Sequence, residues 1–125
     1  MKFLVIIYTD DKLIDALPEG RFDEMMRDCI THTDELRRDG HFVDAHQLEA
    51  PTTARTLRAR SSERVTVTDG PFAETKEILA GFNVIEAADM DEAVRIASEL
   101  PWSRLGAIEV RPVRDLAAVR RRVGA

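Results

Sequence analysis

Phe3-Leu-Val-Ile-Ile-Tyr8, near the start of the chain, is a run of six apolar residues that decides the fold. The run shows no alternation between apolar and polar residues, and it ends at Thr9-Asp10-Asp11, a sequence typical of a turn. It is too short for an ordinary helix and rich in residues that favour strands, so it predicts a strand that is apolar on both faces. Such a strand needs cover on both faces, so we expect helices on one side of its sheet and another layer on the other.

Helical and strand patterns alternate along the rest of the chain. Apolar residues at i, i+3, i+4 and i+7 predict an amphipathic helix from about Pro18 or Arg21 to Asp39. Asp89, followed three residues later by Glu92, forms a capping-box pattern that predicts the start of a second helix. Strands are predicted at residues 41–48, 54–60, 64–69, 81–87 and 107–113, and a short helix is predicted after them.

The order of these elements is β-α-β, a hairpin, β-α-β and a tail helix. The hairpin is formed by residues 54–60 and 64–69, joined by Ser61-Ser62-Glu63, and one of its faces is expected to be solvated. Two β-α-β halves predict an α+β, ferredoxin-like sandwich with the hairpin inserted and helices on one sheet face only. A second copy is the natural cover for the other face, so we expect a homodimer that forms a dimeric α+β barrel.

Composition indicates the class of protein. The chain has 125 residues, which is the size of one domain, with the core predicted at about 1–113 and a basic helix at 114–125. The net charge of −5 argues against direct nucleic-acid binding. One cysteine suits a reducing compartment, and the apolar runs are too short to span a membrane or form a signal peptide. We therefore expect a cytoplasmic protein that does not contact membranes.

Charge is distributed unevenly along the chain. Residues 111–125 carry a local charge of +4, which leaves −9 on residues 1–110. The simplest interpretation is a solvated basic helix on an acidic body. The alternative interpretation is a contact for a partner or an acidic ligand.

The most distinctive stretch is Val67-Thr-Asp-Gly-Pro-Phe-Ala-Glu-Thr-Lys-Glu77. Asp69-Gly70-Pro71 reverses the chain after a strand, because Gly70 tolerates backbone angles that other residues resist and proline fixes the next one. On residue physics alone, Asp69 accepts hydrogen bonds from the amides of this turn. Phe72 is expected to anchor the turn in the core.

This stretch closely resembles the DGPF motif of the YCII-related family, and the resemblance covers about residues 1–113. The other matching segments are Met1-Lys2-Phe3 with Ile7-Tyr8, Glu35-Leu36 through Gly40, Ala54-Arg-Thr-Leu-Arg58, Gly81-Phe82, Ile85-Glu86-Ala87 with Asp91-Glu92-Ala93, and Ile108-Glu-Val-Arg-Pro-Val113. The resemblance implies a ferredoxin-like fold and a dimeric α+β barrel. For some YCII-like members it implies an enzymatic role resting on a histidine and an aspartate. Other members are encoded beside sigma-factor genes or fused to such factors.

The resemblance assigns the aspartate of the site directly, but it does not assign the histidine in the same way. Asp69 matches the motif aspartate and is the first catalytic candidate. In YCII-like members the histidine lies a little over ten residues before the glycine that ends the first helix, and eleven residues before Gly40 this chain has Cys29. His32, one turn further along, and His46 are the remaining catalytic candidates.

Each candidate also has a purely structural interpretation. His32 lies at the edge of the apolar stripe, where it could shuttle protons near neutral pH or be a hydrogen-bonded helix residue. His46 shares a strand face with Asp44, and the pair could be a proton relay or a polar patch. Asp44, Tyr8 and Phe72 are candidates for the lining of a ligand pocket.

We expect no metal and no cofactor, because no metal-ligand spacing and no phosphate-binding glycine loop is visible.

The residues allow three functions. The first function is a dimer that binds a small molecule in a cavity between sheet and helices, and which is an enzyme if Asp69 works with a histidine. The second is a non-catalytic interaction or regulatory module linked to a sigma-type transcription factor. The third is a dimer without chemistry of its own.

Overall fold

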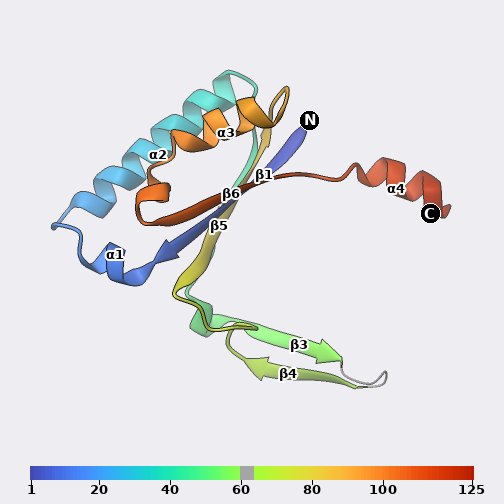
Figure 1. Cartoon of the computed structure of the whole chain (residues 1–125), viewed down its shortest axis with the longest axis horizontal. Helices are drawn as coiled ribbons and strands as arrows, with labels where there is room; N and C mark the ends of the chain where they lie inside the picture. Colours follow the sequence, from blue (N-terminus) through green and yellow to red (C-terminus); the bar gives the residue numbers. More distant parts are fainter. Residues whose placement is uncertain (60–63) are drawn as a thin grey trace.

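The computed structural model describes residues 1–59 and 64–125 of the chain. Its main element is a four-stranded sheet in the order β2-β5-β1-β6, in which every neighbouring pair is antiparallel. The strands are β1 (Lys2–Asp10), β2 (Phe42–Gln47), β5 (Glu77–Glu86) and β6 (Gly106–Pro112). The apolar run therefore lies in a central strand, as predicted, and the mixed α+β architecture is confirmed (Figure 1).

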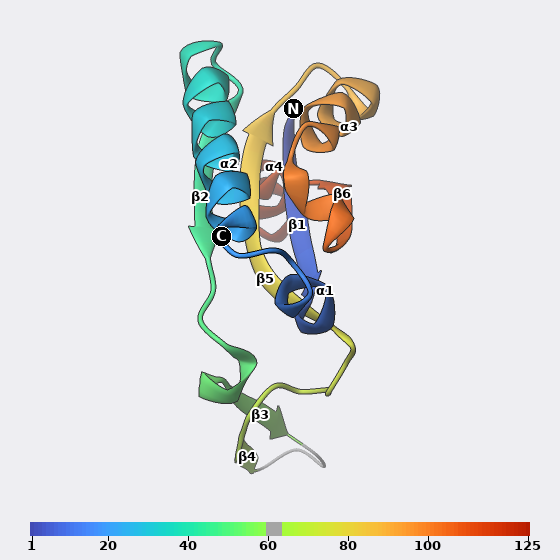
Figure 2. The ribbon, with the colours of Figure 1, turned by 90° about the vertical axis from the view of Figure 1, so that its left-hand side faces the viewer.

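Two helices pack on one face of this sheet, α2 (Arg21–Arg38) and α3 (Met90–Ser98) (Figure 2). Alternate residues of β1 point toward them, and Phe3, Val5 and Ile7 are buried with Ile85 of β5. Burying each of these side chains contributes roughly 1.5–3 kcal/mol to the stability of the fold. The core of the protein therefore lies between this face of the sheet and the two helices.

Local sequence signals explain where the helices begin. Asp89 Oδ1 accepts a hydrogen bond from the Glu92 amide at 2.9 Å, which confirms Asp89 as the N-cap of α3. Glu92 Oε1 accepts one at 2.9 Å from the Ala88 amide, one residue before the amide that a complete capping box uses. At the end of β1 the predicted turn is instead the start of a short helix, α1 (Asp11–Asp15). Its N-cap is Asp10, whose side chain accepts a hydrogen bond from the Lys12 amide at 2.9 Å.

The predicted hairpin forms a separate two-stranded sheet, β3 (Arg55–Ala59) with β4 (Val65–Asp69), preceded by one turn of 3-10 helix, η1 (Pro51–Thr53). The connection predicted at Ser61-Ser62-Glu63 lies outside the described residues. The hairpin extends away from the main sheet (Figure 1). Phe72, predicted to anchor the following turn in the core, is 77% exposed. That prediction is wrong, because the turn belongs to the hairpin and lies far from the helices that form the core.

The face of the main sheet opposite α2 and α3 is apolar, and we call it the open face. Its centre consists of Leu4, Ile6 and Tyr8 of β1 with Phe82 and Val84 of β5, all of intermediate exposure, and polar side chains flank them on β2 and β6. The hairpin and the C-terminal helix α4 (Leu116–Val123) both extend on this side (Figures 1 and 2). Among the described helices, none has the length and apolar character needed to cross a membrane.

Candidate functional site

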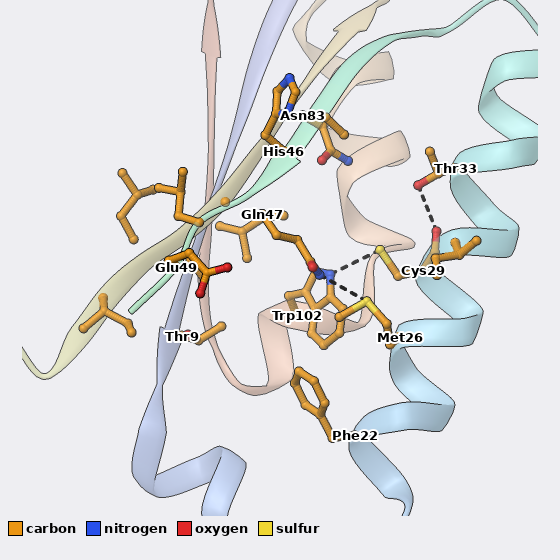
Figure 3. Close-up of a pocket in the computed structure, with 18 of the residues that line it drawn as sticks. Thr9, Phe22, Met26, Cys29, Thr33, His46, Gln47, Glu49, Asn83 and Trp102 are labelled. Carbon is orange, nitrogen blue, oxygen red and sulfur yellow. Dashed lines mark hydrogen bonds between the residues drawn. The ribbon is translucent and has the colours of Figure 1, made fainter. Parts of the chain in front are cut away.

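A cavity of about 680 Å³ lies between α2 and the sheet, and it opens where β2 runs into the hairpin. Its walls come from α2, β2, β5 and the 3-10 helix η2 (Pro101–Arg104), with the inner face of β1 as its floor (Figure 3). Most of the lining is apolar and includes Ile7, Phe22, Met26, Cys29, Ile78 and Trp102.

Aromatic rings and sulfur atoms form one wall of this cavity. The rings of Phe22 and Trp102 lie 5.6 Å apart, centre to centre, and are tilted by 40°. Trp102 Nε1 donates a hydrogen bond to Cys29 Sγ at 3.3 Å, and Gln47 Nε2 donates one to Met26 Sδ at 3.2 Å. Met26 and Cys29 are one helical turn apart on α2, so both donors reach neighbouring points of the same wall (Figure 3).

Polar side chains lie on the floor of the cavity. Thr9 and Asn83 are 6% and 7% exposed, and both line the cavity. Among the described residues, the Asn83 side-chain amide has no hydrogen-bond partner, while every fully enclosed side-chain N or O atom has one. The Asn83 amide is therefore reached through the cavity, where it can donate and accept hydrogen bonds.

His46 lies at the edge of the cavity, but its ring belongs to the open face. His46 Nε2 lies 3.1 Å from Asp44 Oδ2, and the ring centre lies 5.7 Å from that of Phe82. Both partners of the predicted Asp44–His46 pair are well exposed. Tyr8, another predicted pocket residue, also lies on the open face, with its hydroxyl 3.5 Å from Glu109 Oε1. Asp44, Tyr8 and Phe72 do not line the cavity.

His32 joins the two core helices and lies outside the cavity. Its Nε2 donates to the Ile96 carbonyl at 3.3 Å, and its Nδ1 lies 3.3 Å from Glu99 Oε2. The ring is buried between α2 and α3. In this position the histidine serves the structural role that its place on the apolar stripe allowed.

Asp69 is the last residue of β4, and its side chain is 90% exposed. It lies 3.4 Å from Arg55 Nη1, and the turn is held instead by the Gly70 amide, which donates to the Ala54 carbonyl at 2.7 Å. In the described part of the chain no histidine contacts Asp69. The three predicted catalytic residues therefore lie at three separate places in one chain: the hairpin, the helix pair and the sheet edge.

Asn83 was not predicted from the sequence. Trp102 follows Pro101, so from the sequence it could either pack over the end of the second helix or line the mouth of a pocket. Asn83 could have been noticed as the one polar residue inside the otherwise apolar Gly81-Phe-Asn-Val-Ile85. Trp102 carried no such signal, because its partner Cys29 is 73 residues away in sequence.

Asp10 was also missed. It is buried, caps α1 and lies 3.6 Å from Lys76 Nζ. Its two contacts stabilise the end of β1 beside the cavity.

On the open face, the hydrogen bond from Arg111 to Glu109 and the negative charge of Glu109 raise the pKa of the exposed Arg111 guanidinium. Over residues 1–59 and 64–125, no group of three or more His, Cys, Asp or Glu side chains is arranged to hold a metal ion. The described lining offers a ligand apolar surface together with hydrogen-bonding and charged side chains.

Comparisons with known proteins place the chain in a family. An uncharacterised protein of Rhizobium meliloti (strain 1021) is 36% identical over 115 residues, which cover 90% of this chain and 92% of that protein. A solved structure of 5-chloro-2-hydroxyhydroquinone dehydrochlorinase from Burkholderia phenoliruptrix, in complex with 2,5-dihydroxybenzoquinone, aligns with a TM-score of 0.47 at 15% identity. That alignment covers 91% of this chain and 94% of the dehydrochlorinase chain. The model of the YCII-related domain matches residues 1–117, and the chain belongs to this family.

Proposed function

We propose that the protein binds a small organic molecule in the cavity between α2 and the sheet, and that it does so as a dimer. The observation that carries the proposal is the Asn83 amide, which is buried, lacks a hydrogen-bond partner among the described residues and faces an otherwise apolar cavity. Natural binding sites have this composition: mostly apolar walls with a few polar groups that orient the ligand. Because this amide is reached through the cavity, a ligand that enters the cavity can exchange hydrogen bonds with it.

The dimer is supported by the open face. Its five apolar residues form a continuous surface on two central strands, and a chain of this size gains stability by covering it. The strand order and the two β-α-β units correspond to a ferredoxin-like repeat, and two such sheets facing each other would form an α+β barrel. The proposal concerns binding and assigns no reaction.

Binding can be tested with tetralin, a bicyclic hydrocarbon smaller than the cavity. Trp102 is the single tryptophan and lies in the cavity wall, so its fluorescence reports occupancy directly. We expect a saturable change in emission for the wild-type protein. Thr33→Phe, which places a ring in the cavity from α2, should weaken binding at least tenfold.

The matched control is Thr31→Phe, the same substitution at an exposed position of α2 that does not line the cavity. This variant should bind tetralin as the wild type does. Equal affinities for wild type and both variants would show that binding occurs elsewhere. Absence of saturable binding to wild type would contradict the proposal.

A further inference from the structure

The cavity contains N–H donors that are bonded to sulfur, or to no group among residues 1–59 and 64–125. The donors are Trp102 Nε1, Gln47 Nε2 and the side-chain amide of Asn83. We propose that the ligand is a neutral, planar molecule that carries carbonyl or hydroxyl oxygens and accepts hydrogen bonds from these donors. This inference rests on the proposed function and specifies the class of its ligand.

The indole of Trp102 is the most informative donor. It can donate but not accept, and the residue is only 5% exposed, so it must find its partner inside the protein. The partner is Cys29 Sγ, and a thiol sulfur is a weak acceptor. A ligand oxygen that replaces the sulfur would form a stronger hydrogen bond without requiring Trp102 to move far.

Gln47 repeats this arrangement at the mouth of the cavity. Its amide nitrogen donates to Met26 Sδ at 3.2 Å, and a thioether is again a weak acceptor. Because Gln47 is exposed, its amide could be hydrated by water instead, yet it points inward toward α2 (Figure 3). Asn83 completes the set on the floor, where its amide has no partner among the described residues.

The walls and the edge of the cavity select shape and charge. Phe22 and Trp102 offer two ring surfaces, and the adjoining sulfur atoms favour contact with aromatic edges. Asp11, Asp34 and Glu49 line the cavity, against a single lysine or arginine in the lining, Arg37. Arg37 is already bonded to Asp34 at 3.0 Å and lies over the Phe42 ring. This excess of carboxylates disfavours a carboxylate or phosphate ligand.

The test compares 1-tetralone with tetralin, which share a fused ring system and differ by one carbonyl oxygen. Equilibrium dialysis measures both affinities independently of Trp102 fluorescence. We expect wild type to bind 1-tetralone at least tenfold more tightly than tetralin. We expect the anion tetralin-1-carboxylate to bind more weakly than the ketone.

Two variants test whether the side-chain amides cause the preference for the ketone. Asn83→Leu and Gln47→Leu each replace an amide by an apolar group of similar size, and each should reduce the ketone preference at least threefold. Gln47 is exposed, so this variant tests the inference even if Asn83→Leu does not fold. Thr31→Leu, at the exposed position on α2, is the control and should keep the full preference.

The outcomes distinguish the proposed binding cavity from the proposed class of ligand. Equal binding of 1-tetralone and tetralin by wild type would overturn the donor inference and leave the binding cavity intact. A ketone preference that persists unchanged in both amide variants would also overturn it. Failure of wild type to bind any of these probes would overturn the proposed function and the inference together.

Discussion

At the scale of single residues, the same residue type has different roles that only the three-dimensional structure distinguishes. His32 and His46 are both in regular elements, yet one is buried between two helices and the other is exposed at a sheet edge. The difference depends on Ile96, whose carbonyl accepts a hydrogen bond from His32, and on Glu99, whose carboxylate lies 3.3 Å from the ring. Both residues lie more than sixty positions beyond His32 in the sequence.

Replacing His32 should destabilise the fold. His32→Ala removes a buried donor and leaves the Ile96 carbonyl without that side-chain partner, so we expect the free energy of unfolding to fall by about 1–3 kcal/mol. Urea denaturation followed by circular dichroism measures this change. Thr31→Ala, at an exposed position of α2 away from the cavity and the open face, should change stability by less than about 0.5 kcal/mol. Equal losses in both variants would contradict the structural role of His32.

Asp69 should tolerate substitution as far as stability is concerned. Its ion pair with Arg55 is exposed on both sides, and such pairs contribute roughly 0–1 kcal/mol. Asp69→Asn and Asp69→Ala should therefore both melt close to wild type in thermal denaturation. An Asn variant that folds normally but loses ligand binding would support a functional role for the carboxylate, because an amide oxygen is a poor proton acceptor.

At the scale of elements, close backbone approach determines where β2 can lie. Gly81 of β5 faces β2 across the sheet, and a Cβ atom at this position would lie 2.6 Å from the His46 carbonyl oxygen. This oxygen belongs to the backbone of β2, so it cannot move aside as the end of a flexible side chain can. This glycine therefore fixes the position of a strand that forms one wall of the cavity.

Gly81→Ala should cost stability and disturb the cavity. We expect a loss of about 1–3 kcal/mol, as for other overpacked positions, together with weaker tetralin binding. Chemical denaturation and the Trp102 titration measure the two effects. Unchanged stability would indicate that β2 lies further from β5 than the structure describes.

Most elements could be predicted from the sequence because their signals are local. The α2 stripe, the Asp89 N-cap and the pairing of Leu57 with Val67 in the hairpin all depend on neighbouring residues. The start of β5 was missed because Glu77 directly follows a charged loop segment, and α1 was missed because five residues carry no helical period. From the sequence, the cavity could be located no more closely than between the sheet and the helices. The residues that contact one another in its walls are too far apart in the chain to be paired by local patterns.

At the scale of the whole molecule, apolar surface remains on one side. The hairpin and α4 extend on the side of the open face (Figure 1), and among their exposed residues are Leu57, Val67 and Leu116. A partner that covers the open face would lie between the hairpin and α4. We propose a second copy of the chain for this position, because the acidic body of one chain would complement the basic tail of the other.

The chain should therefore be dimeric at micromolar concentration. Sedimentation equilibrium is expected to give twice the chain mass of 14.1 kDa. Ile6→Asp, which places a charge in the middle of the open face, should shift the equilibrium to monomer. Thr31→Asp on the exposed side of α2 should leave the dimer unchanged. A wild-type mass of one chain across this concentration range would contradict the proposed assembly.

Because α4 lies apart from the core, the rate of trypsin cleavage at its arginines reports how often this helix unfolds. Its eight residues are well capped, but none is buried, and isolated helices of this length are marginal in water. Trypsin should therefore cut first at Arg120, Arg121 or Arg122, at a rate set by how often the helix frays. If a second copy covers α4, cleavage will slow as the protein is concentrated, so the digestion rate measures association without any label.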